Sequence, residues 1–447
     1  MRSPRKFISS AWRRHPRLLV LGALLVVGAG GALAAYLILS PRAGNYNNPK
    51  AAFETQPVAP AVKKKPPRPE TFKWPIYGYT PTRTRFLDVN LHPPYQKLWK
   101  SRRGGALIEF QPVLANGVLY YVNNNAVAYA LSAKSGRVIW WRKLGSLNAS
   151  SPAWDNGKLY IVTLSGMIHC LNAKNGKVLW KRHLPSRAES SPIVVNGIVY
   201  FGSENGTVYA LRAKGGAKVW TYHASGAVKA GLAFNKGNLY FGDYSGEVTA
   251  LRASDGSRVW STGTSGASFN RSGQFYSTPA VAYGRVYLGN TDGLVYSFVA
   301  KNGQLAWRHS TGNYVYAAPA VGTVKGLGPT VFIGSYDGNF YALDARSGNQ
   351  DWAFHDGGKI SGAPTVVGGI VYYSSLGHRN SVGLDVRNGK RVWWWPNGAF
   401  NPVISDGKRL YVTTRSKVIA LVPKQKKAAK PKAPAAKKRR PPQAKPK

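Results

Sequence analysis

A ten-residue segment that ends in tryptophan recurs along this chain of 447 residues, and it limits the possible folds more than any other feature. Residues 131–140 read LSAKSGRVIW, residues 171–180 read LNAKNGKVLW, and residues 211–220 read LRAKGGAKVW. Related segments end at positions 260, 307, 352 and 393, so the successive spacings are 40, 40, 40, 47, 45 and 41 residues. A period near forty residues is typical of propeller and solenoid folds.

Each period reads as a series of short strands. In residues 191–220, the pairs Asn196-Gly197, Asn205-Gly206 and Gly215-Gly216 divide the sequence into four β-rich pieces. Such pairs supply the positive φ angles that tight hairpin turns need. Four antiparallel strands per period are the layout of one propeller blade, whereas recurrent Gly, Pro and β-branched residues disfavour a helical repeat.

The number of periods predicts a closed ring. Eight dipeptides begin a period, at residues 111, 151, 191, 230, 278, 318, 363 and 401, but the eighth period ends without a tryptophan. An unassigned segment, Tyr95 to Trp99, lies 41 residues before Trp140. We therefore expect an all-β, eight-bladed β-propeller of four-stranded antiparallel blades, in which the Trp99 segment supplies the missing outer strand and removes the open edges.

The repeated tryptophans have a structural interpretation. Each blade leaves one sheet face bare, and a large flat indole can cover it by packing on a small residue of the next blade, such as Ala133 or Ala173. We interpret eight tryptophans as blade-docking residues in preference to ligand platforms: Trp99, Trp140, Trp180, Trp220, Trp260, Trp307, Trp352 and Trp393.

Outside the propeller, the sequence predicts a membrane anchor and two basic segments. Residues 18–39 are uncharged and long enough to cross a bilayer as a helix. Basic residues concentrate before this run, which predicts a single-pass protein of the cell membrane with a cytoplasmic N-terminus and an extracytoplasmic propeller. The alternative is a signal peptide cleaved after Ala34. The expected organisation is 1–17 basic N-terminus, 18–39 transmembrane helix, 40–73 Pro/Lys-rich stalk, 74–423 propeller and 424–447 disordered basic tail.

The charge balance favours anionic partners. The chain carries 62 Lys and Arg against 17 Asp and Glu, a formal net charge of +45. A strongly basic surface attracts nucleic acid, anionic lipid or acidic polymers, and an extracytoplasmic location disfavours nucleic acid. The sequence leaves open whether the charges cluster into a binding face. One cysteine, Cys170, excludes an intramolecular disulfide and a cysteine-based metal cluster.

The repeat resembles that of the quinoprotein-like, or PQQ-like, β-propeller family, whose motif runs Ala-x-Asp-x-x-Thr-Gly-Lys-x-x-Trp. Ala210, Gly216 and Trp220 match it, and Asp344 and Gly348 match it in a later period. The family includes quinone-dependent dehydrogenases and non-catalytic scaffolds such as the outer-membrane assembly protein BamB. The large dehydrogenases hold their cofactor near a vicinal Cys-Cys pair, which a chain with one cysteine lacks.

We therefore expect a membrane-anchored, BamB-like scaffold or binding protein of the cell envelope, with no catalytic, cofactor or metal residues. A PQQ-dependent oxidoreductase is the first alternative, with PQQ implied by the resemblance alone, and a polyanion or nucleic-acid binder is the second. The partner would be an envelope protein or an anionic polymer or lipid. Two connections between periods carry candidate partner-binding residues, although ordinary loop variation also explains them: Phe269, Arg271, Phe275, Tyr276, Tyr314 and Tyr316.

Deleting residues 424–447 should weaken the association of the extracytoplasmic part with anionic vesicles and leave its melting temperature nearly unchanged. Each Lys or Arg near an anionic surface contributes on the order of 1 kcal/mol, and the deleted segment carries eleven of them with no acidic residue. Vesicle co-sedimentation at increasing salt measures the effect. Binding that persists in about 1 M salt, where the screening length is about 3 Å, would contradict an electrostatic contact.

Overall fold

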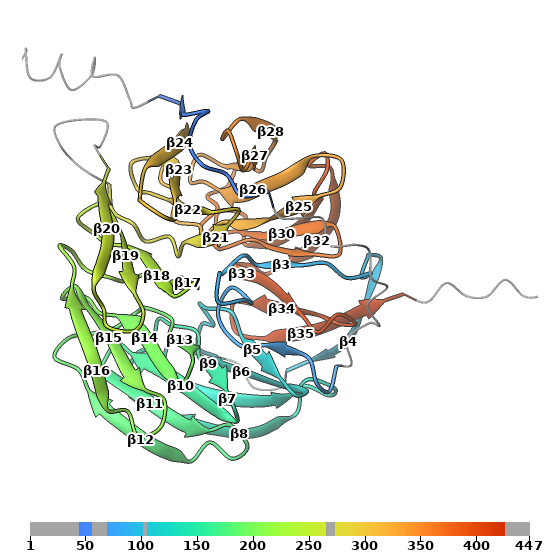
Figure 1. The fold of residues 1–447 in the computed structure, drawn as a ribbon. Helices are drawn as coiled ribbons and strands as arrows, with labels where there is room; N and C mark the ends of the chain where they lie inside the picture. Colours follow the sequence, from blue (N-terminus) through green and yellow to red (C-terminus); the bar gives the residue numbers. More distant parts are fainter. Residues whose placement is uncertain (1–43, 56–68, 102–104, 265–272, 425–447) are drawn as a thin grey trace, which may run out of the picture.

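The computed structural model describes residues 44–55, 69–101, 105–264 and 273–424, and the regular elements in these ranges are β-strands. The strands form eight separate sheets, each built on four antiparallel strands, and the sheets stand in a ring (Figure 1). The predicted eight-bladed propeller is confirmed. No helix that could span a membrane occurs in the described ranges, and the predicted transmembrane segment, residues 18–39, lies outside them.

The first four blades follow one another along the chain, each from its inner to its outer strand. Blade 1 consists of β5 (Val113–Ala115), β6 (Val118–Val122), β7 (Val127–Ser132) and β8 (Val138–Lys143). Blade 2 consists of β9 (Ala153–Asp155), β10 (Lys158–Thr163), β11 (Met167–Asn172) and β12 (Val178–His183). Blade 3 consists of β13 (Ile193–Val195), β14 (Ile198–Gly202), β15 (Thr207–Arg212) and β16 (Lys218–His223). Blade 4 consists of β17 (Ala233–Asn235), β18 (Asn238–Gly242), β19 (Glu247–Arg252) and β20 (Arg258–Gly263).

The other four blades complete the ring. Blade 5 consists of β21 (Ala280–Ala282), β22 (Arg285–Gly289), β23 (Leu294–Val299) and β24 (Leu305–Ser310). Blade 6 consists of β25 (Ala320–Val324), β26 (Gly328–Gly334), β27 (Asn339–Asp344) and β28 (Gln350–His355). Blade 7 consists of β29 (Thr365–Val367), β30 (Ile370–Ser375), β31 (Asn380–Asp385) and β32 (Arg391–Pro396). Blade 8 consists of β33 (Gly398–Ser405), β34 (Leu410–Thr414), β35 (Val418–Pro423) and β4 (Tyr95–Lys100).

The two faces of the ring differ in their connections. Because strands within a blade are antiparallel, the first and third hairpin turns lie on one face, which we call the lower face. The second turns and the connections between blades lie on the opposite, upper face. Lower-face turns use the expected residues: Asn156 and Gly157 have φ angles of 42° and 76°. Two successive positive φ angles make the turn that suits the twist of a hairpin.

The tryptophans join each blade to the next. In seven of the eight, the indole Nε1 donates a hydrogen bond of 2.9–3.1 Å to a backbone carbonyl at the third turn of the following blade. The acceptor residues are Ala133 for Trp99, Ala173 for Trp140, Ala213 for Trp180, Ala253 for Trp220, Ala300 for Trp260, Ala345 for Trp307 and Val386 for Trp352.

The glycine of the repeat is needed for the same contact. A Cβ atom added at Gly256 would lie 2.7 Å from Cε3 of Trp220, which is too close for any carbon contact. Gly256 also has a φ of 76°, so two constraints select glycine at this position. The seven tryptophans that make this contact therefore lie on the flat backbone of the next blade.

Trp393 is the exception, and the closure of the ring explains it. Blade 8 takes its outer strand β4 from the N-terminal side of the chain, with Ala420 paired to Trp99 and Pro423 paired to Tyr95. No tight third turn joins β35 to β4, so the usual acceptor and glycine do not exist there. Trp393 packs instead against the rings of Tyr95, Tyr372 and Trp395, at centroid distances of 6.4, 5.4 and 6.2 Å. The predicted closure by the Trp99 strand is confirmed.

The segment before β4 fills the axis of the ring. Strand β2 (Lys73–Trp74) pairs with β5 of blade 1, and β3 (Phe86–Leu87) pairs with β29 of blade 7. Between them, backbone carbonyls of residues 75, 81, 82 and 84 accept hydrogen bonds from the inner strands of blades 2, 4, 5 and 6. This axial segment, residues 73–87, thus contacts most of the blades.

Two arginines are completely buried in the axial segment. Arg83 donates to the carbonyls of Tyr77, Ser191 and Leu232, and Arg85 donates to those of Arg83 and Pro319. Burial lowers the pKa of Arg83 to about 9. Both residues have positive φ angles, 59° and 52°, a strained conformation that the bonds to neighbouring blades hold in place.

Residues 40–73 are not a free stalk throughout, and the prediction is wrong for residues 44–55. Strand β1 (Tyr46–Asn47) adds a fifth strand to the outer edge of blade 5, pairing with Arg308 and Trp307. Further along, Arg285 donates to the carbonyls of residues 51 and 52, and Phe53 stacks on Tyr283 at 5.5 Å. The chain is therefore fixed to blade 5 well before the propeller begins.

The tryptophan contact gives a stability prediction. Replacing Trp220, which is 9% exposed, by alanine should lower the free energy of unfolding by about 3–5 kcal/mol, because the indole leaves a cavity and an unsatisfied carbonyl. Trp394, which is 50% exposed, is the matched control, and its replacement by alanine should cost less than about 1 kcal/mol. Chemical denaturation compares the two. Equal losses would show that the docking contact contributes little.

Candidate functional site

The upper face has a cavity on the propeller axis. Its volume is about 240 Å³, and its walls come from the connections that enter blades 1 and 3 to 8. Tyr77 of the axial segment forms part of the lining, and the ring of Tyr77 lies over the buried guanidinium of Arg85 at 4.5 Å. The axial segment therefore closes the cavity from below, and the cavity opens on the upper face.

One side of the axial cavity gathers carboxyl groups. Glu109 and Glu189 line it, and Glu204 lies beside Glu189. Lys229 contacts two of them, with its Nζ 3.0 Å from Glu189 Oε1 and 3.5 Å from Glu204 Oε1. Arg187 also pairs with Glu204, at 3.6 Å, whereas the ion pairs of the described residues give Glu109 no cationic partner.

Burial controls the ionisation of this cluster. It raises the pKa of Glu109, where a hydrogen bond from Asn124 only partly opposes it, and it raises the pKa of Glu189. Burial also acts to raise the pKa of Glu204, but a hydrogen bond with Glu189 and the charges of Lys229 and Arg187 outweigh it and lower the pKa. Burial therefore favours the neutral form of Glu109 and Glu189, whereas the charged form of Glu204 is stabilised.

The other side of the cavity is a wall of tyrosines. Tyr276, Tyr316 and Tyr336 line the cavity, Tyr314 packs on Tyr316 at 5.8 Å, and Tyr244 packs on Tyr276 at 6.3 Å. Tyr316 is the centre of the group, 5.9 Å from Tyr276 and 4.9 Å from Tyr336. The Tyr276 hydroxyl donates to Glu189 Oε2 at 3.1 Å, which connects the tyrosine wall to the carboxyl cluster.

The tyrosine wall brings together three residues selected from sequence and two that were missed. Tyr276, Tyr314 and Tyr316 belong to the predicted partner-binding connections. Tyr244 and Tyr336 come from second turns, where the chain reads FGDYSG and IGSYDG at equivalent positions of two blades. This repeated tyrosine was a usable signal, because second turns reach the same upper face as the connections.

Phe275, which was also predicted to bind a partner, does not belong to the tyrosine wall. Phe275 is completely buried and packs on Gly242 and Tyr296, so its assignment to a binding surface is wrong. It fills the space between blades 4 and 5 because Gly242 leaves no side chain there. Phe269 and Arg271 lie outside the described residues.

A groove of about 580 Å³ continues the site between blades 5 and 6. It shares Tyr316 and Tyr336 with the axial cavity and extends past Tyr314 and Lys359. The Lys359 ammonium lies 5.6 Å above the Tyr336 ring, and the Lys229 ammonium lies 5.4 Å above the Tyr244 ring. The tyrosine wall therefore already accepts lysine ammonium groups on its ring faces.

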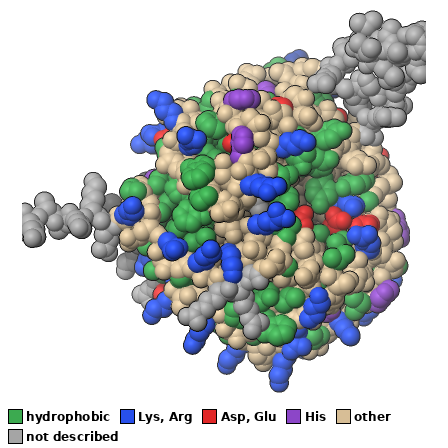
Figure 2. Space-filling view, turned by 180° about the vertical axis from the view of Figure 1, so that it is seen from behind, with side chains coloured by type: hydrophobic (Ala, Val, Ile, Leu, Met, Phe, Trp, Pro, Cys, Tyr) green, Lys and Arg blue, Asp and Glu red, His purple; other side chains and the backbone are tan. Residues whose placement is uncertain are grey.

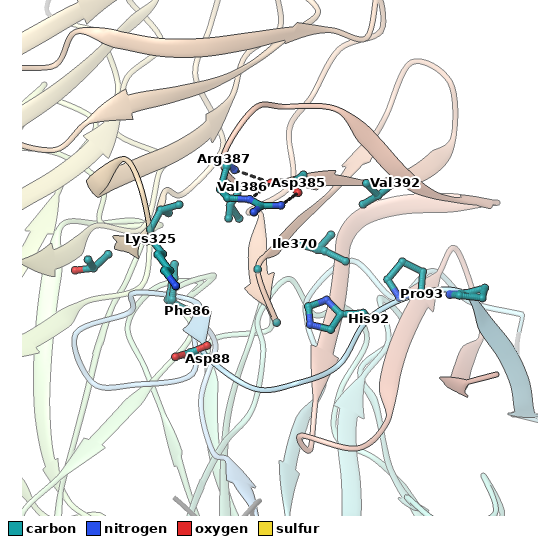
Figure 3. A pocket seen from close by; sticks show the side chains of 15 residues that line it. Phe86, Asp88, His92, Pro93, Lys325, Ile370, Asp385, Val386, Arg387 and Val392 are labelled. Carbon is teal, nitrogen blue, oxygen red and sulfur yellow. Dashed lines mark hydrogen bonds and ion pairs between the residues drawn. The ribbon is translucent and has the colours of Figure 1, made fainter. Parts of the chain in front are cut away.

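A second cavity, of about 760 Å³, lies on the lower face between blades 6 and 7 (Figure 3). Phe86, Ile370 and Val386 give it an apolar lining. Two of its charged residues pair with each other, since Arg387 forms two hydrogen bonds of 3.0 and 2.7 Å to Asp385. The upper-face site has more aromatic side chains in its lining.

The comparisons with known proteins agree with this architecture. A family profile described as outer membrane protein assembly factor BamB matches residues 95–163, 124–270 and 204–431, which together extend over most of the propeller. The chain belongs to this family of PQQ-like propellers. A search of curated protein sequences found no match.

Solved structures of this fold include scaffolds and enzymes. BamB from Moraxella catarrhalis is similar with a TM-score of 0.61 and 17% identity, over 73% of this chain and 99% of that chain. A quinohemoprotein alcohol dehydrogenase from Pseudomonas putida has a TM-score of 0.68 and 14% identity, over 82% and 83%. A europium-containing methanol dehydrogenase has a TM-score of 0.67 and 14% identity, over 81% and 99%. Identities this low establish the fold alone.

In the described part of this BamB-family propeller, Asp356, Ser375 and His378 have the residue types of a hydrolytic triad. Asp356 accepts hydrogen bonds from Ser375 at 2.5 Å and from His378 at 3.0 Å. A catalytic serine would have to bond the histidine, and here it bonds the carboxylate directly. Cys170 is buried, and burial raises the pKa of its thiol to about 11, which disfavours a nucleophilic role. Among the described residues, no group of three His, Cys, Asp or Glu could hold a metal ion.

Lys229 should be the residue whose loss most perturbs the carboxyl cluster. Replacing it by glutamine should lower the free energy of unfolding by about 1–3 kcal/mol at pH 7, because the partly buried Glu189 and Glu204 lose their ammonium partner. The difference in unfolding free energy between the wild type and the variant should become smaller as pH falls. Burial raises the pKa of Glu189, and loss of Lys229 removes an interaction that lowers it, so protonation of Glu189 as pH falls stabilises the folded variant.

Lys236→Gln is the matched control for this prediction, because Lys236 and its partner Glu54 are both largely exposed, 70% and 57%. An exposed pair contributes about 0–1 kcal/mol. Melting temperatures of both variants at pH 7 and at pH values falling toward about 4.3, the ordinary pKa of glutamate, test the prediction. A Lys229 deficit that is independent of pH would argue against unbalanced carboxylates.

Proposed function

We propose that this member of the BamB family is a non-catalytic scaffold of the cell envelope, which binds a protein partner through the axial site on its upper face. The proposal includes the anchor predicted at residues 18–39, with the propeller outside the cytoplasm. The observation that carries it is the tyrosine wall beside the carboxyl cluster. Tyrosine is enriched among residues that dominate protein interfaces, because it contributes large contact area and a polar hydroxyl.

The position of the site also supports a binding role. Its side chains come from connections of many blades, and the axial segment holds those blades together from below. A surface assembled this way is rigid before a partner arrives, so binding loses little conformational entropy. Tyr314, which is 49% exposed, extends the aromatic surface toward solvent.

The alternative of a PQQ-dependent oxidoreductase is suggested by the dehydrogenases that share the fold. PQQ is a planar tricarboxylate, and a site for it needs cationic side chains. Glu109 and Glu189 line the axial cavity, and the lining cation Lys229 is already paired with Glu189 and Glu204. The two central arginines lie beneath Tyr77 and bond backbone carbonyls. These charges do not fit the cofactor, and we derive no reaction step through it.

The alternative of a polyanion binder rests on the basic surface. Figure 2 shows lysine and arginine side chains spread over one face and separated by other residues, with a few acidic side chains beside a hollow. A scattered distribution favours weak association with anionic surfaces over one defined site. Such association is compatible with a scaffold that lies close to a membrane.

Site-specific photo-crosslinking in intact cells tests the proposal. A photoreactive residue at Tyr314 on the upper face should capture a partner protein, and one at exposed Lys174 on the lower face should not. Capture from Tyr314 should weaken at least about ten-fold when Tyr316 and Tyr336 are both replaced by serine, since interface tyrosines contribute about 2 kcal/mol or more.

Two further outcomes would contradict the proposal. Reduction of a dye by the purified full-length protein supplied with PQQ, Ca²⁺ and an alcohol or sugar as electron donor, above a protein-free control, would establish an oxidoreductase. Protection of the propeller from protease in spheroplasts, with digestion after lysis, would place it in the cytoplasm.

A further inference from the structure

The carboxyl cluster indicates the charge of the partner. Three carboxyl groups, Glu109, Glu189 and Glu204, gather at the axis of a propeller whose residues 74–423 carry 38 basic and 15 acidic side chains, a formal charge of +23. The ion pairs of the described residues give Glu189 and Glu204 a lysine or arginine partner, whereas Glu109 is bonded to the amide of Asn124 at 3.2 Å. The cavity thus has one carboxyl group more than its own cations engage.

Lys229 shows how this site holds an ammonium group. Its Nζ contacts Glu189 and Glu204, and it lies over the Tyr244 ring at 5.4 Å. Two carboxylates and an aromatic face thus surround one cation. Glu109, with Tyr276 and Tyr316 across the same cavity, repeats these components without the cation.

Resting on the scaffold function proposed above, we propose that the axial site binds an extended basic segment of a partner protein, with one lysine or arginine side chain inserted between Glu109, Glu189 and the tyrosine wall. The cavity of about 240 Å³ holds a single long side chain, and the adjoining groove of about 580 Å³ accepts the neighbouring residues of the segment. Charge complementarity favours this occupant, because the cluster is acidic within a propeller of net positive charge.

The chain's own basic C-terminal segment is a less suitable occupant. The described residues end at Lys424, whose amide bonds the carbonyl of Pro94 at 2.8 Å. Pro94 lines the lower-face cavity, so the C-terminal segment begins on the face opposite the axial site. A partner protein that approaches the upper face meets the site directly.

Binding of fluorescently labelled hexalysine to the propeller, residues 44–424, tests the proposal by anisotropy at low salt. The closed ring with its own core justifies this fragment, and its melting temperature checks folding. The double variant Glu109→Gln, Glu189→Gln should bind at least about ten-fold more weakly, which corresponds to the loss of one charge pair. The double variant Glu70→Gln, Asp88→Asn removes two exposed carboxylates elsewhere and should bind within about two-fold of the wild type.

Two other measurements distinguish a specific site from general attraction. Hexalysine with acetylated side chains should not bind, and Tyr316→Ser should weaken hexalysine binding about three-fold or more through loss of the aromatic face. Equal binding by the wild type and the Glu109/Glu189 variant would overturn the proposal. If unmodified hexalysine does not bind while crosslinking from Tyr314 is intact, the basic segment is rejected and the scaffold function still stands.

Comparison of residues 44–424 with the longer residues 44–447 identifies the source of the segment. Equal hexalysine affinity of the two proteins supports an external partner. Affinity reduced about ten-fold or more in the longer protein, and restored by the shorter one, would show that the chain's own C-terminal segment occupies the site and would overturn the assignment to a partner.

Discussion

The contact between a tryptophan and the third turn of the next blade is the interaction on which the rest of this propeller depends. It combines an indole hydrogen bond to a backbone carbonyl with close packing on a glycine, as for Trp220 on Ala253 and Gly256. A four-stranded blade cannot bury both faces of its own sheet, so each blade is stable only against its neighbours. Repetition of one contact at a period near forty residues therefore produces the ring.

Closing the ring changes the contact at one place and creates the axial segment at another. Because β4 completes blade 8 from the N-terminal side, blade 8 has no third hairpin turn for Trp393 to contact. Trp393 packs on aromatic rings instead. The chain that precedes β4 must then cross the axis, and the buried guanidinium groups of Arg83 and Arg85 bond it to carbonyls of the surrounding blades. The axis is thus filled from below, and the remaining cavity opens on the upper face.

The axial cavity differs in character from the surface around it. Carboxyl groups and tyrosines meet there in a protein with a formal net charge of +45. A partly buried carboxyl group without a cationic partner has an energetic cost that a bound cation would relieve. The proposed scaffold function and the proposed basic partner segment rest on this one local contrast, because the fold occurs in BamB and in dehydrogenases alike.

The sequence by itself determined the repeat, the strands, the number of blades and the closing role of the Trp99 strand, because these depend on local turn chemistry and on counting. It also selected Tyr276, Tyr314 and Tyr316. Only the tertiary structure decided that Phe275 is core, that Tyr244 and Tyr336 join the tyrosine wall, and that Glu109, Glu189 and Glu204 meet at the axis. Likewise, residues 44–55 join blade 5 through a two-residue strand with no periodic pattern. The physical reason is distance along the chain: blade closure brings together residues from separate periods, and no local pattern encodes which of them face the same cavity.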